Sequence, residues 1–151
     1  MAAIGRSSGV GELSQERREA RRNRMLTYAA CCFAAALVIH GVDHLRRGFA
    51  VVTPEVLWGG SLLSVIGLAA VLLVLRGHRL APLVAVAVGF PTAAGVVAAH
   101  LLPRWSALSD SFVSNGADLS SWVTVLAEIV AAVALGVAGA RALRATTTTA
   151  V

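Results

Sequence analysis

Four long apolar runs are the feature that most constrains the fold of this chain. They cover residues 25–45, 56–75, 80–102 and 119–143, and the charged residues gather between and outside them. A helix needs ~20 predominantly apolar residues to cross the ~30 Å of hydrocarbon in a bilayer. Charged residues make up 14% of the chain, whereas a soluble domain has roughly a quarter. We therefore expect an all-α integral membrane protein, a bundle of four membrane helices.

The same pattern divides the chain into three parts. Residues 1–24 form a basic cytoplasmic segment, rich in Gly, Ser and Arg, that we expect to be partly disordered. Residues 25–143 form the four-helix transmembrane domain, and the threonine-rich residues 144–151 form a disordered C-terminal tail. Thr53 and Asp118 stand where the N-caps of the second and fourth helices belong, and Pro54 suits a first helical position.

The connection over residues 103–118 is the longest of the three. Trp105, Leu108 and Phe112 recur in it at helical spacing. A short amphipathic helix lying in the headgroup layer would bury such a face. We predict this interfacial helix on the outer side of the membrane, between the third and fourth membrane helices.

The basic residues indicate the orientation, and all thirteen of them are arginines. With the N-terminus inside, the outer flanks hold three: Arg46, Arg47 and Arg104. The cytoplasmic flanks hold nine: Arg17, Arg18, Arg21, Arg22, Arg24, Arg76, Arg79, Arg141 and Arg144. Cytoplasmic flanks carry the excess of positive charge, so we predict that both termini are cytoplasmic. We expect Arg46 and Arg47 to pair with Asp43, Glu55, Asp110 or Asp118 on the outer side.

The composition also indicates the setting. The arginines flank apolar segments and are not interleaved with aromatic residues, which favours anionic lipid headgroups as their partner and argues against nucleic acid. The use of Arg in place of Lys, with abundant Ala, Val and Gly, is typical of a high-GC bacterial genome. We therefore place the chain in a bacterial plasma membrane.

Ionisable residues at membrane depth are costly and are the first candidates for function. His40 and His44 are four residues apart and share one helix face, with Asp43 between them. His100 ends the third helix, which the alternating topology brings to the same outer end. Glu128 lies ~15 Å inside the fourth helix at helical rise. Ser121 and Thr124 precede it at helical spacing, so we predict a polar stripe leading to Glu128.

This set of side chains predicts a metal site. Two imidazoles one turn apart can bind one ion, and a third imidazole or a carboxylate can complete its shell. The predicted ligands are His40, His44, His100, Asp43 and Glu128, and such a set suits Zn, Cu, Ni or Fe. Asp43 or Glu128 could instead orient an imidazole through a hydrogen bond. A b-type haem held by His100 with His40 or His44 is an alternative.

Three functions remain open at this stage. The favoured one is an accessory or interaction subunit of a membrane complex, with other membrane subunits or a second copy as partner. Small residues supply faces for such helix contacts: Gly60, Ser64, Gly67, Gly136 and Ala140. The alternatives are a metal-binding or haem-binding membrane protein, and a small proton-coupled or cation-coupled transporter that uses Glu128. No nucleophile–base pair or nucleotide motif is recognisable, so an enzyme is expected only through the metal.

Overall fold

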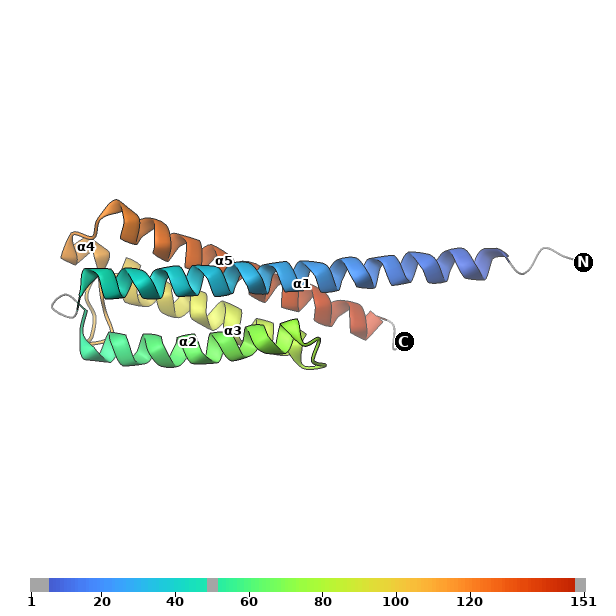
Figure 1. The fold of residues 1–151 in the computed structure, drawn as a ribbon, viewed down its shortest axis with the longest axis horizontal. Coiled ribbons are helices and arrows are strands. Elements are labelled where there is room, and N and C mark those ends of the chain that lie inside the picture. Colours follow the sequence, from blue (N-terminus) through green and yellow to red (C-terminus); the bar gives the residue numbers. More distant parts are fainter. Residues whose placement is uncertain (1–5, 49–51, 149–151) are drawn as a thin grey trace, which may run out of the picture.

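The computed structural model describes residues 6–48 and 52–148, and it is helical over most of them (Figure 1). The elements in chain order are α1 (Arg6–Arg47), α2 (Pro54–Leu75), α3 (Ala81–Val96), the π-helical turn η1 (Val97–Leu101), α4 (Phe112–Asn115) and α5 (Leu119–Thr148). Within these residues, four stretches are long and apolar enough to cross a membrane: Gln15–Arg47, Pro54–Leu75, Ala81–Leu101 and Leu119–Ala145. The prediction of an all-α chain with four such helices is confirmed.

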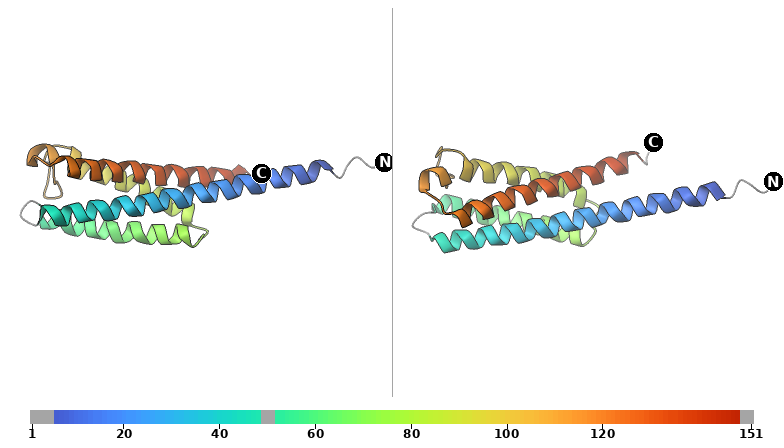
Figure 2. Two further views of the ribbon diagram at one scale, coloured as in Figure 1. Left: turned by 45° about the horizontal axis from the view of Figure 1, so that its top comes forward. Right: turned by 90° about the horizontal axis from the view of Figure 1, so that it is seen from above.

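The four long helices run side by side in alternating directions, so the start of α1 and the end of α5 lie toward one end of the bundle (Figures 1 and 2). We call this the terminal end. The opposite end carries α4, η1 and the α1–α2 connection, and we call it the α4 end. The first turns of α1 project beyond the other helices at the terminal end. The fold therefore gathers residues 40–47, 97–101 and 110–121 at the α4 end.

Two helices extend beyond the boundaries expected from hydropathy. Helix α1 begins at Arg6, inside the segment 1–24 that we expected to be partly disordered. Helix α5 continues to Thr148, past the boundary at residue 143. Extending an existing helix costs far less than starting one, so helical structure continues from the apolar core into the polar flanks. Residues 1–5 and 149–151 lie outside the described residues.

Both predicted helix caps are confirmed. The Thr53 hydroxyl accepts a hydrogen bond from the Val56 backbone N–H at 3.3 Å, with Pro54 in the first helical turn of α2. The Asp118 carboxylate accepts one from the Ser121 backbone N–H at 3.0 Å. Each cap satisfies a donor that the first turn of a helix leaves without a partner.

The predicted interfacial helix differs from the observed one. Residues 102–111 are not helical, and α4 is a single turn over Phe112–Asn115. Trp105 and Leu108 are exposed while Phe112 is buried, so the three do not share one apolar face. Phe112 packs instead against the rings of His100 and Trp122, with distances of 4.7 and 5.5 Å between the ring centroids. The expectation from helical spacing fails because burial of Phe112 against η1 and α5 decides the conformation of this connection.

Glycine allows α3 and α5 to pack very closely. A Cβ atom on Gly89 of α3 would lie 2.6 Å from the backbone oxygen of Ala132 in α5. A Cβ atom on Gly139 of α5 would lie 2.6 Å from the backbone oxygen of Pro82. Small residues at such points bring helix backbones into contact within a bilayer. This contact holds α5, which carries Glu128, against α3 and the η1 turn that follows it.

Two of the small faces predicted for helix contacts are used inside this chain. Gly67 of α2 lies against Phe33 and Leu37 of α1, and Gly136 of α5 lies against Phe90 of α3. Gly60 has open space around it.

Candidate metal site

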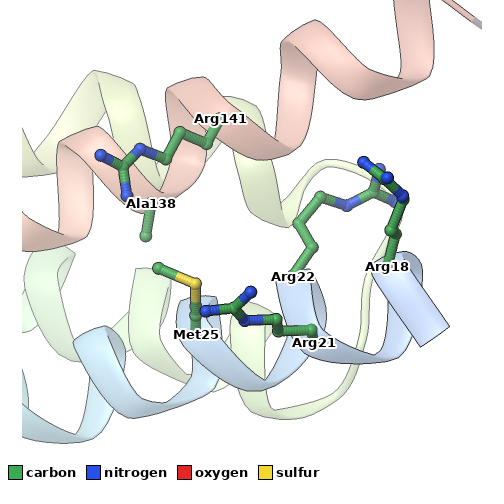
Figure 3. A pocket seen from close by; sticks show the side chains of 6 residues that line it. All are labelled: Arg18, Arg21, Arg22, Met25, Ala138 and Arg141. Carbon is green, nitrogen blue, oxygen red and sulfur yellow. The ribbon is translucent and has the colours of Figure 1, made fainter.

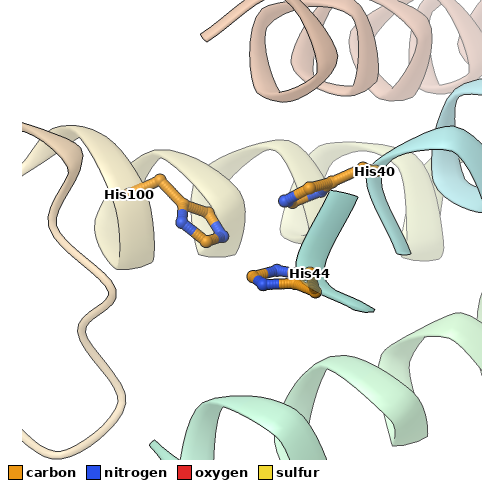
Figure 4. A group of neighbouring side chains, drawn as sticks. All are labelled: His40, His44 and His100. Atoms are coloured by element: carbon orange, nitrogen blue, oxygen red, sulfur yellow. The ribbon is translucent and has the colours of Figure 1, made fainter. Parts of the chain in front are cut away.

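Three imidazole rings meet at the α4 end of the bundle. His40 and His44 lie one turn apart on α1, and His100 reaches them from η1 (Figure 4). The ring centroids are 4.6 Å apart for His40 and His44, 4.9 Å for His40 and His100, and 5.3 Å for His44 and His100. One ligand nitrogen of each ring lies within 4.8 Å of the other two. We call these three residues the histidine cluster, and their predicted convergence is confirmed.

The local backbone helps to explain how His100 reaches the cluster. The chain leaves α-helical geometry at Val97 and forms a π-helical turn through Leu101. A π turn contains one residue more than an α turn and therefore changes which side chains face inward; such turns are frequent at functional sites. His100 lies in this turn and is buried, and His40 on α1 is buried as well.

The Glu128 carboxylate fixes one nitrogen of His40. Nδ1 of His40 is in hydrogen-bonding contact with Oε2 of Glu128, and both side chains are buried. When the carboxylate is ionised and the imidazole is neutral, Nδ1 donates this hydrogen bond and Nε2 carries the lone pair. Nε2 is buried and has no hydrogen-bond partner among the described residues. Glu128 thus lies behind His40 as an orienting group and leaves Nε2 free to bind a ligand.

Asp110 occupies the corresponding position behind His100. Nδ1 of His100 lies 3.2 Å from the backbone oxygen of Asp110 and 3.6 Å from its carboxylate Oδ2. Asp110 also accepts hydrogen bonds from both terminal nitrogens of Arg47 and, at 2.9 Å, from Asn115. Burial alone raises the pKa of Asp110, but the nearby His100 imidazole and the hydrogen bonds from Arg47 outweigh it and hold that pKa well below its usual range. A buried aspartate is therefore ionised here and compensated by Arg47.

His44 is the least constrained member of the cluster. Its Nδ1 lies 3.9 Å from Oδ2 of Asp110, too far for a hydrogen bond, and this buried atom has no partner among the described residues. The ring is half-buried, whereas the other two are buried. Two of the three rings therefore have a polar partner on Nδ1, and the third has none among the described residues.

A second set of ion pairs closes this end of the bundle. Arg46 donates to Asp43 at 2.8 and 3.0 Å, to Asp118 at 2.9 Å and to the Ser121 hydroxyl at 3.1 Å. The backbone N–H of Ser121 and the guanidinium of Arg46 hold the pKa of Asp118 below its usual range. The end of α1 is thereby tied to the start of α5. The predicted pairing of Arg46 and Arg47 with acidic residues is confirmed for Asp43, Asp118 and Asp110.

The sequence-predicted residues do not all meet. Asp43 is buried but lies in the Arg46 ion pair, apart from the three nitrogens of the histidine cluster. The polar stripe on α5 is interrupted, because fully buried Val125 lies between Ser121 and Glu128. The hydroxyl of Thr124 donates to the backbone oxygen of Ser121 within the same helix. Only Glu128 of that stripe reaches the histidine cluster.

Asp110 is the residue of this site that sequence reasoning missed as a candidate. The sequence indicates Asp110 only as one possible ion-pair partner of Arg46 and Arg47, which need acidic partners on the outer side of the membrane. Its position depends on the fold of residues 102–111, where no periodic pattern helps.

Comparison with protein-family models, with curated proteins and with solved structures finds no match for this chain. Its function therefore has to be inferred from the geometry of the site.

Proposed function

We propose that this protein is a multi-pass membrane protein that binds one transition-metal ion through His40, His44 and His100. The observation that carries the proposal is the buried, unpartnered Nε2 of His40, held beside two further imidazoles by a carboxylate on the opposite nitrogen. A buried polar atom without a partner costs ~1–3 kcal/mol, and a metal ion at this point would remove that cost.

The chemistry of the ligands narrows the class of ion. Neutral imidazole nitrogens suit Zn, Cu, Ni and Fe, whereas Mg and Ca prefer oxygen. Tetrahedral zinc with bonds of ~2.0–2.1 Å places its nitrogen ligands about 3.3 Å apart. The nitrogens here lie within 4.8 Å, so small side-chain rotations would close the shell. Three imidazoles leave a fourth position for water or for a group from a partner.

The partners behind the rings support the same proposal. Metal-binding histidines commonly donate their other ring N–H to a carboxylate or a backbone carbonyl, which fixes the tautomer. Glu128 does this for His40, and the backbone oxygen of Asp110 is placed to do it for His100. We therefore assign Glu128 an orienting role and leave Asp43, in its Arg46 ion pair, outside the ligand set.

The geometry favours an ion over the alternatives from the sequence. A porphyrin has to lie between its two axial imidazoles, whereas these rings contact one another at 4.6–5.3 Å. Beyond Glu128, the buried face of α5 continues with Ala132, Leu135 and Ala138, which offer no polar path for a proton or cation. The accessory-subunit hypothesis remains compatible with metal binding, because a partner could supply the fourth ligand.

The proposed setting is the plasma membrane of a bacterium, with both termini cytoplasmic and the histidine cluster near the outer surface. The nine-to-three arginine bias supports this orientation. The start of α1 and the end of α5 lie at the terminal end of the bundle, whereas the histidine cluster lies at the α4 end.

The test is a metal titration of detergent-purified protein against a chromophoric chelator. His44→Ala removes a ligand without breaking a hydrogen bond, so the variant should fold. We expect one ion per wild-type chain and at least a 100-fold weaker affinity in His44→Ala. His78→Ala, in the turn between α2 and α3, is the matched control and should bind like the wild type. Failure of the wild type to bind Zn, Cu, Ni or Fe, or equal weakening in both variants, would exclude the site.

A further inference from the structure

Four arginines surround a pocket at the terminal end, far from the histidine cluster. The pocket lies between the first part of α1 and the last part of α5 (Figure 3). It is lined by Arg18, Arg21, Arg22, Met25, Ala138 and Arg141, and we call it the arginine pocket.

Among the described residues, no carboxylate forms an ion pair with an arginine of this pocket. The acidic residues Asp43, Asp110, Asp118 and Glu128 form their ion pairs at the α4 end, far from these arginines. Nε of Arg22 is buried and has no hydrogen-bond partner among the described residues. Four positive charges around one pocket repel one another, so a bound anion would stabilise this arrangement.

The position of the pocket indicates what kind of anion fits. Residues 25–42 follow directly on α1 and carry no charge. The lining combines the apolar side chains of Met25 and Ala138 with four arginines, whose aliphatic stems add apolar surface and whose guanidinium groups add charge (Figure 3). Guanidinium groups bind phosphate oxygens in pairs and with strong hydrogen bonds. A ligand with a phosphate group and an apolar chain matches both parts of the lining.

We propose that the arginine pocket binds the phosphate of an anionic phospholipid from the leaflet at the terminal end. The headgroup would bridge Arg18, Arg21 and Arg22 of α1 to Arg141 of α5, with an acyl chain along the apolar surface that begins at Met25. This site is independent of the proposed metal ion, since it lies at the opposite end of the bundle and shares no residue with it.

The test measures lipid binding to the full-length protein in neutral detergent. The probes are phosphatidylglycerol, phosphatidylcholine and inorganic phosphate, and the readouts are the dissociation constant and the shift in melting temperature. We expect phosphatidylglycerol to bind at least tenfold more tightly than phosphatidylcholine and to raise the melting temperature. Inorganic phosphate should produce no comparable shift, because it lacks the acyl chain.

Matched double variants locate the binding. Arg22→Gln with Arg141→Gln should lose at least tenfold in affinity for phosphatidylglycerol. Arg76→Gln with Arg79→Gln removes two charges from the turn between α2 and α3 at the same end, and it should bind like the wild type. An equal loss of affinity for phosphatidylglycerol in both double variants would show that only the net charge matters and would overturn the proposal. Unchanged binding in the pocket variant, or full replacement of the lipid by inorganic phosphate, would overturn it as well.

Discussion

At the scale of single residues, the contact between His40 and Glu128 decides which ring nitrogen is available. Glu128 has no arginine partner among the described residues, in contrast to Asp110, which Arg47 holds. A buried carboxylate beside an imidazole stabilises the positive charge that a bound metal places on the ring. Glu128 therefore matters to the site through His40.

Glu128→Gln tests this role. Glutamine keeps the size of the side chain and a carbonyl acceptor, but it cannot ionise. We expect a folded protein whose metal affinity is ~10–100-fold weaker, the usual cost of losing such a partner. The measurement is the same chelator competition, with Thr124→Val as control because the Thr124 hydroxyl is bonded within its own helix. A metal affinity equal to that of the wild type in Glu128→Gln would contradict the orienting role and leave Glu128 with a packing role only.

At the scale of helices, the approach of α3 to α5 depends on glycine. Gly89 faces the α5 backbone, whereas Gly95 on the same helix has open space where a Cβ atom would lie. Gly89→Ala should lower the free energy of unfolding by about 1–3 kcal/mol, because backbone atoms cannot move aside as a side chain can. Gly95→Ala should be neutral or stabilising, since alanine favours helices. Chemical unfolding in mixed micelles compares the two, and equal stabilities would contradict the close contact.

The N-cap of α5, Asp118, should make the stability of the protein depend on pH. The pKa of Asp118 is lowered, so its charge contributes stability above the unfolded value of ~3.9 and loses that contribution as the pH falls. Asp118→Asn keeps a good N-cap but removes the charge that pairs with Arg46. We expect the wild type to melt at a higher temperature than Asp118→Asn at pH 7. The difference should narrow from about pH 4 downward, and one that stays constant with pH would contradict the assignment.

The helices and the site differ in how far the sequence predicts them. Runs of ~20 apolar residues identify membrane helices without tertiary information, and the caps Thr53 and Asp118 mark two of the starts. The i, i+4 spacing of His40 and His44 predicts that they share a helix face. Because the first and third membrane helices end on the same side, the sequence also predicts that His100 lies near them. The π turn at Val97–Leu101 and the burial of Asp110 follow from contacts between distant segments, which no local pattern encodes.

At the scale of the whole molecule, the two ends of the bundle differ in how their charges are balanced. Arg46 and Arg47 at the α4 end are paired with buried or capping aspartates, whereas no described carboxylate pairs with an arginine of the arginine pocket at the terminal end. Unpaired arginines are retained on the cytoplasmic side of membranes. The uncompensated charge thus supports a cytoplasmic terminal end.

Reporter fusions test this orientation. A periplasm-active phosphatase fused after Arg144 should be inactive, because the cytoplasm keeps its disulfides reduced. The same enzyme fused after Gly116, in the connection between α4 and α5, should be active. The reverse pattern would place the histidine cluster on the cytoplasmic side.

The most direct measurement of the metal site is X-ray absorption spectroscopy on the zinc-loaded or copper-loaded protein. We predict three imidazole nitrogens at ~2.0–2.1 Å for zinc and no sulfur in the shell. His44→Ala should lower the imidazole count by one. A sulfur ligand at ~2.3 Å, which would implicate Cys31 or Cys32, or a shell of oxygen atoms alone, would contradict a site built from His40, His44 and His100.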